Sequence, residues 1–304
     1  MLLFLEQVLN GLQFGVMLFL LAAGLSLVLG IMNLVNLAHG SLYMVGAFVA
    51  ASVTRLTGSF LLGLAAALPA TALVGMAVEV VALRRLYSRD HLDQVLATFG
   101  LILFFNELVR ILWGPRALFM DVPPWLAGTV EVIPGAPYPA FRLAIILVGG
   151  AVAIFLYWIV RRTRLGMLIR AGASNREMVG ALGVDINRLY TLVFGLGAML
   201  AALAGVMAGP IYAVEVGMGE PILIVAFVVI VIGGIGSIRG ALVGALMVGL
   251  VDTLGRAFLP TLFRLFMAPS AADGIGAALA SMAIYILMAA VLAWRPRGLF
   301  PANA

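Results

Sequence analysis

The chain has 304 residues, of which 64% are hydrophobic and only 10% are charged. So few charged side chains cannot cover a soluble globular domain of this length, and the composition therefore predicts a membrane protein with several spanning segments. The lack of cysteine excludes disulfides and thiolate chemistry, and two histidines do not form a metal site by themselves.

Nine apolar runs predict the membrane segments. Each run is continuous rather than alternating, which is typical of spanning helices and not of the strands of a β-barrel. We therefore expect an all-α fold, a polytopic helical transmembrane bundle that forms a single domain over residues 1–304, with about 8–9 membrane segments. The runs cover residues 8–30, 41–53, 61–83, 95–112, 143–160, 189–212, 222–233, 241–258 and 276–294.

The seventh run, 222–233, is short for a spanning helix. About a dozen apolar residues reach only part of the way across a bilayer, so this helix is expected to re-enter the membrane or to pack within the bundle. The residues that follow it form the candidate gate or re-entrant segment: Gly233, Gly234, Gly236 and Ser237.

Basic residues predict the orientation of the bundle. The net charge of +5 would suggest nucleic acid as a partner of a soluble protein, but here the arginines stand between apolar runs, and no nucleic acid is expected. Loops on the side of segment 161–188 hold twelve of the eighteen basic residues, which assigns that side to the cytoplasm. Segment 114–141 contains six of the thirteen prolines and is expected to be a turn-rich periplasmic loop.

The same bias predicts where the two termini lie. If run 222–233 crosses the membrane, the chain crosses nine times, with its N-terminus outside and its C-terminus in the cytoplasm. If this run does not cross, the N-terminus lies inside.

Segment 161–188 is the longest charged segment of the chain. Within it, residues 166–185 are expected to form a pair of short amphipathic helices that lie along the membrane and dock on a cytosolic partner. A merely solvated interfacial helix would have the same pattern. The candidate coupling residues are Gly166, Arg170, Ala171, Asn175, Arg176, Glu177, Gly183 and Asp185.

Asn33, Asn36 and His39 recur at three-residue spacing inside apolar sequence. Facing lipid would leave their polar groups unsatisfied, so they must face protein, water or unwound backbone. They are therefore candidates for a lumen or gate. The alternative is that they hydrogen-bond across helices or occupy an interfacial turn.

Four blocks of sequence carry a resemblance to a known family. They are residues 24–47, residues 97–101 leading to Gly114, residues 166–175 with Gly183, and residues 233–241 with Gly244. In this order they are similar to the signatures of the permease subunits of branched-chain amino-acid ABC importers of bacteria. Two positions depart from the usual pattern: Leu37 stands where the family commonly has phenylalanine, and Arg239 where it has proline or a similar residue.

The resemblance implies a non-catalytic permease subunit in the bacterial inner membrane. Its implied partners are two cytosolic ATP-binding subunits docked around 170–185, a second related permease (the family favours a heterodimer) and a periplasmic substrate-binding protein. The chain itself would hold no cofactor or metal. Since its sequence contains no lysine, it has no phosphate-binding loop, and ATP and magnesium would bind in the partner subunits.

The resemblance also implies a class of substrate. Members import leucine, isoleucine and valine, whereas other relatives carry urea, short amides or aromatic acids. The polar contacts expected along the substrate pathway are Asn33, Asn36, His39 and Tyr43.

The alternative class of function is a secondary transporter driven by an ion gradient. Such a protein needs ionisable residues within its spans, and the candidates are Glu79, Glu107 and Asp252. Each lies near a helix end or near an arginine, which favours structural ion pairs. Glu215 and Glu220 are expected at the periplasmic rim. An intramembrane enzyme has no support, since the sequence has no zinc-protease or nucleophile-elbow motif.

Overall fold

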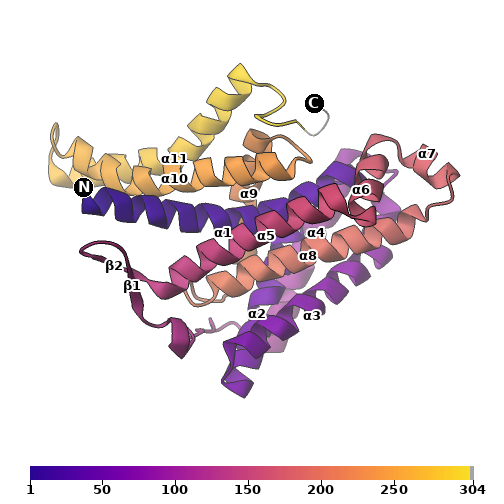
Figure 1. Cartoon of the computed structure of the whole chain (residues 1–304), viewed down its shortest axis with the longest axis horizontal. Coiled ribbons are helices and arrows are strands. Elements are labelled where there is room, and N and C mark those ends of the chain that lie inside the picture. Colours follow the sequence, from indigo (N-terminus) through magenta and orange to yellow (C-terminus); the bar gives the residue numbers. More distant parts are fainter. Residues whose placement is uncertain (302–304) are drawn as a thin grey trace.

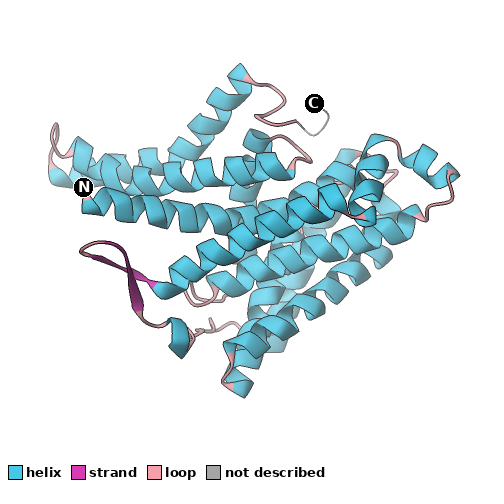
Figure 2. Cartoon of the chain, viewed as in Figure 1, coloured by secondary structure: helices cyan, strands magenta, loops and turns pink. Residues whose placement is uncertain are grey.

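The computed structural model describes residues 1–301 and is helical almost throughout (Figure 2). The helices are α1 (Leu2–Met32), α2 (His39–Thr57), α3 (Phe60–Val81), α4 (His91–Trp113), α5 (Ala140–Arg162), α6 (Arg164–Ser174), α7 (Arg176–Ala181), α8 (Ile186–Ala208), α9 (Gly219–Gly233), α10 (Ile238–Phe263) and α11 (Pro269–Trp294), with short 3₁₀ turns at Leu83–Leu86 and Pro124–Leu126. This architecture confirms the expected all-α membrane bundle.

Seven helices are long and apolar enough to cross a membrane: α1, α3, α4, α5, α8, α10 and α11. Their side chains are apolar on all sides, because a helix in a bilayer meets apolar surroundings both in the bundle and in the lipid. Helices α1 and α8 are the most enclosed, with 89% and 78% of their apolar windows buried, and they form the centre of the bundle.

The proline-rich segment forms a hairpin at one end of the bundle. Strands β1 (Thr129–Ile133) and β2 (Ala136–Pro139) pair in antiparallel register, and Gly135, with φ of 82°, makes the turn between them. The N-terminus lies at this hairpin end, whereas α6 and α7 lie at the opposite end (Figure 1). We refer to these as the β1–β2 end and the α6–α7 end.

Helix α2 begins halfway along the bundle and not at its end. Asn33 closes α1 in a left-handed conformation (φ 51°), and the chain then turns back along α1. As a result, the His39 ring lies against Gly24 of α1, and Gly24 in turn packs on Gly197, the midpoint of α8. The sequence suggests an ordinary second segment here, but α2, with 19 residues, starts inside the bundle and runs to the β1–β2 end; we call α2 and α9 half-helices because both start inside the bundle.

Helix α9 repeats this arrangement in the opposite direction. After α8 reaches the β1–β2 end, residues 209–218 turn back into the bundle, where the Gly217 amide lies 3.3 Å from the Met44 sulfur of α2. Helix α9 then begins at the same depth as α2 and runs to the α6–α7 end, where Gly233 packs on Gly240. It is the short helix that the sequence predicts.

Taken with their return segments, α2 and α9 each complete one passage between the two ends. The chain therefore passes nine times, and its N-terminus and C-terminus lie at opposite ends (Figure 1). The two halves are built alike: α1 packs on α10 and on half-helix α9, as α8 packs on α3 and on half-helix α2. Because the corresponding helices run in opposite directions, the fold is an inverted repeat.

Candidate functional site

The N-termini of α2 and α9 meet at the centre of the bundle. A Cβ atom on Gly40 would overlap the carbonyl group of Gly219, and one on Gly219 would overlap the carbonyl group of Gly40. Only glycine permits this approach. The contact holds the positive ends of two helix dipoles side by side at mid-depth, an arrangement that favours a negative charge nearby. We call this contact the half-helix junction.

Glu220 lies in the first turn of α9, beside this junction. Asn106 of α4 donates a hydrogen bond of 2.6 Å to the Glu220 carboxylate, and both residues border a small hollow with Gly40, Ser41 and Gly219. The expectation that Glu220 lies at the outer rim is wrong, because α9 starts at mid-depth. The sequence did not predict its hydrogen bond with Asn106; the only signals were a polar residue inside run 95–112 and an acidic residue just before run 222–233.

Three of the four residues expected on the substrate pathway are buried near the junction. The Asn36 side-chain oxygen accepts a 3.0 Å hydrogen bond from the Ala38 amide and shapes the entry into α2. The ring nitrogens of His39 have no hydrogen-bond partner within residues 1–301, and the Tyr43 backbone packs on Gly205. The fourth, Asn33, lies apart from them, on a cavity nearer the α6–α7 end.

The three acidic residues considered for ion coupling all have basic partners. Glu79 is fully buried, and its carboxylate lies 3.0 Å from Arg84 and accepts hydrogen bonds of 2.7 Å from Tyr87 and Thr191. Burial and the hydrogen bond to Glu79 raise the pKa of Tyr87. Its hydroxyl therefore keeps its proton and remains a hydrogen-bond donor. Glu107 pairs with Arg110 and Asp252 with Arg256, at 2.9 Å in each case. The prediction of structural ion pairs is confirmed.

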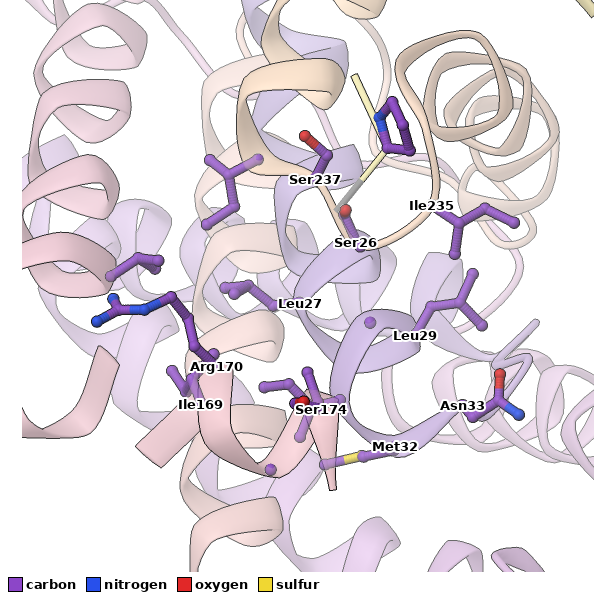
Figure 3. A pocket seen from close by; sticks show the side chains of 18 of the residues that line it. Ser26, Leu27, Leu29, Met32, Asn33, Ile169, Arg170, Ser174, Ile235 and Ser237 are labelled. Carbon is purple, nitrogen blue, oxygen red and sulfur yellow. The ribbon is translucent and has the colours of Figure 1, made fainter. Parts of the chain in front are cut away.

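A cavity of about 1460 Å³ lies near the α6–α7 end. Its walls are the second half of α1, the end of α5, helices α6 and α7, and the turn between α9 and α10, as Figure 3 shows with Ser26, Arg170 and Ser237. Six arginines line it: Arg89, Arg161, Arg170, Arg176, Arg239 and Arg295. We call it the arginine cavity.

The candidate gate residues form the turn between α9 and α10 beside this cavity. Gly234 (φ 103°) and Gly236 (φ 79°) adopt left-handed conformations that favour glycine, and Gly236 packs on Gly30 of α1. The Ser237 hydroxyl caps α10 by accepting a 3.1 Å hydrogen bond from the Gly240 amide. Gly236 and Ser237 line the cavity, whereas Gly233 packs on Gly240 behind it.

The candidate coupling segment forms two short helices, as predicted. Thr163 caps α6, Asn175 caps α7 with a 2.9 Å hydrogen bond to the Met178 amide, and Asp185 caps α8. Gly183 makes the turn after α7 with φ of 87°. Among the remaining candidates, Arg170, Arg176 and Glu177 are exposed on the cavity, Gly166 packs on the end of α5 and Ala171 is half-buried.

Comparison with known proteins identifies the family. Residues 7–292 match the family described as branched-chain amino acid transport system, permease component. The chain is 31% identical to the high-affinity branched-chain amino acid permease protein LivH of Salmonella typhimurium, over 86% of this chain and 89% of that protein. It is also 31% identical to BraD of Pseudomonas aeruginosa, over 97% and 95% of the two chains.

A more distant relative is the ribose import permease protein RbsC of Escherichia coli, which is 26% identical over 77% of this chain and 72% of that protein. No solved structure matches the chain. The match across nearly the whole bundle, half-helices and α6–α7 segment included, shows that this chain belongs to the branched-chain amino-acid permease family and is a multi-pass transmembrane permease component.

Proposed function

We propose that the chain is the permease subunit of a bacterial ABC importer and forms half of the translocation path for branched-chain or related hydrophobic amino acids. The observation that carries this proposal is the capped helix pair α6–α7, which lies at the arginine-rich end of a bundle whose sequence belongs to this family. The names of LivH and BraD, both nearer in identity than the ribose permease, favour amino acids as the solute.

The helix pair is suited to transmit movement from a cytosolic subunit. Helix α6 packs on α1, α5 and α8, so a displacement of α6 acts directly on the two central helices. The exposed Arg170, Arg176 and Glu177 offer charged contacts to that subunit. In this proposal the α6–α7 end lies in the cytoplasm, two ATPase subunits bind there, and they hold the ATP and magnesium.

The solute path passes the half-helix junction. A carboxylate at mid-depth is too costly to leave against acyl chains, by roughly 2.5–3.5 kcal/mol on insertion scales. The exposed face with Asn106 and Glu220 therefore lies toward a second, related permease across a wet path. There Glu220 binds the ammonium group of an amino acid, and the α2 and α9 N-termini attract its carboxylate.

The four residues predicted on the pathway have two roles in this proposal. Asn36, His39 and Tyr43 hold the start of α2 in place beside the path, and Asn33 ends α1 with a left-handed turn that begins the return segment. A periplasmic binding protein delivers solute at the β1–β2 end.

The test is purification of the tagged chain from membranes, followed by an ATPase assay with candidate solutes and their binding protein. We expect two ATPases and a second permease to co-purify, and solute-loaded binding protein to stimulate hydrolysis. Replacing Arg170 and Glu177 together is expected to weaken docking and transport, whereas R85Q, an exposed change at the same end but outside α6 and α7, is not.

Two results would count against this account, one against the whole proposal and one against a part of it. One is a chain that purifies alone and whose uptake survives ATP depletion but collapses with the proton gradient. The other, which would refute only the coupling role of α6–α7, is unchanged docking and transport in the Arg170 and Glu177 double variant.

A further inference from the structure

Two arginines of the arginine cavity contact the ring of one tyrosine and have no counterion in the described part of the chain. The guanidinium carbons of Arg161, at the end of α5, and of Arg239, at the start of α10, lie 5.5 and 5.4 Å from the ring centroid of Tyr157. Neither forms an ion pair within residues 1–301. Since the two like charges repel each other, an anion bound beside them would relieve that repulsion.

The rest of the cavity strengthens this preference for an anion. Arg170 and Arg295 also lack a carboxylate partner in the described part of the chain, and the only acidic residues on the walls are Asp90 and Glu177. A concave site with an excess of one charge focuses its field on a ligand of the other sign. The ligand is therefore expected to be an anion that several guanidinium groups bind at once.

The cavity also continues onto the exposed surface of α5, one of the seven helices that are long and apolar enough to cross a membrane. Ile154 and Tyr157, which line it, are 72% and 47% exposed on the spanning helix α5. The walls also include apolar side chains, among them Leu27 of α1 and Leu242 of α10 (Figure 3 shows Leu27). The buried Ser26 hydroxyl, which has no partner within residues 1–301, lies on the same wall and can donate to a ligand.

We propose that the arginine cavity binds an anionic phospholipid of the leaflet at the α6–α7 end. Its phosphate would lie between Arg161 and Arg239, whose planar guanidinium groups suit phosphate oxygens, and an acyl chain would follow the groove past Ile154 and Leu242. The continuity with exposed apolar surface on the spanning helix α5 favours a lipid over a soluble phosphate ester. The site does not depend on which solute is carried.

The test is titration of the full purified chain with lipids, followed by native mass spectrometry. Phosphatidylglycerol is compared with phosphatidylcholine of the same acyl chains, and glycerol 3-phosphate is the soluble phosphate probe. The test variant is R161Q/R239Q. The matched control is R85Q/R162Q, which removes the same charge from two exposed arginines at the same end, outside the cavity.

We expect phosphatidylglycerol to bind wild type and R85Q/R162Q equally and to bind R161Q/R239Q roughly tenfold more weakly, with phosphatidylcholine weak throughout. Equal phosphatidylglycerol binding by both double variants, or equal binding of the two lipids, would overturn the proposal. Displacement of the lipid by equimolar glycerol 3-phosphate would also overturn it, in favour of a soluble anion. If size-exclusion elution shows that R161Q/R239Q does not fold, the single variants R161Q and R239Q are measured instead. Each is expected to bind phosphatidylglycerol several-fold more weakly than wild type.

Discussion

At the scale of single residues, the half-helix junction depends on two glycines that touch backbone to backbone. Flexible side chains can move aside for an added methyl group, but the carbonyl groups of Gly40 and Gly219 belong to helix ends that are themselves packed in the bundle. An added Cβ must therefore push α2 and α9 apart.

We predict that Gly219→Ala destabilises the folded chain by about 1–3 kcal/mol, the usual cost of overpacking a core. Gly100→Ala is the matched control, because Gly100 lies within α4 with open space around its Cα, and alanine there is expected to be neutral or slightly stabilising. The thermal unfolding midpoints of the two purified variants provide the measurement. Equal midpoints would show that the junction is not a close contact.

The role proposed for Glu220 is also tested by one substitution. Glu220→Gln keeps the shape of the side chain and its hydrogen bond from Asn106, but it removes the charge that would bind an ammonium group. We expect the solute concentration for half-maximal uptake in proteoliposomes to rise roughly tenfold, since a hydrogen bond to a charged group contributes about 1.5–3 kcal/mol.

The control for this prediction is Glu107→Gln. Glu107 is the next residue to Asn106 on α4, but its side chain is 60% exposed and its carboxylate pairs with Arg110. An exposed pair of this kind contributes little, so uptake should stay near that of the wild type. If the two variants transport alike, Glu220 does not contact solute, although the importer assignment itself would stand.

At the scale of helices, the continuity and length of the apolar runs were sufficient to predict where most of the bundle lies. Continuous apolar runs give the spanning helices, and the length of 222–233 alone indicates that α9 is short. The same reasoning missed that α2 starts at mid-depth, because its apolar run gives no sign of the return segment between Asn33 and His39. That depth is set by the packing of Gly40 on Gly219, a contact between residues far apart in sequence.

The candidate sites also differ in how far the sequence predicts them. The coupling helices were predictable because charged residues and caps such as Asn175 are local signals. The Asn106–Glu220 pair and the arrangement of Arg161 and Arg239 around Tyr157 arise only when separate helices pack together.

Helix α7 has only six residues, so its stability depends on its cap. Asn175→Ala removes the hydrogen bond to the Met178 amide and is expected to cost about 1 kcal/mol, enough to fray α7 without unfolding the bundle. We predict a several-fold lower stimulation of the partner ATPases at an unchanged unfolding midpoint. Asn187→Ala, an exposed change in the first turn of α8 where Asp185 is the cap, should behave as wild type. Equal stimulation in the two variants would contradict a coupling role for α7.

At the scale of the whole molecule, the inverted repeat accounts for the charge distribution. With their return segments, α2 and α9 each complete one passage, in opposite directions, so the chain passes between the two ends nine times. In this arrangement twelve of the eighteen arginines lie at the α6–α7 end. The proposed orientation, with this basic end in the cytoplasm, agrees with the bias of cytoplasmic loops toward arginine and lysine. The two repeats meet at the half-helix junction, so a change in their relative position would open or close the path beside Glu220.

The nine passages can be tested directly, because the natural sequence has no cysteine and single cysteines can therefore be introduced without background. In spheroplasts, a membrane-impermeant maleimide should label T57C, G128C and A268C, which lie at the β1–β2 end, and should label S88C and A181C only after permeabilisation. T57C is the decisive position, since it reports whether α2 returns to the end from which α1 started. If T57C, like A181C, were labelled only after permeabilisation, the segment from Asn33 to Thr57 would not complete a passage. The inverted repeat would then be wrong.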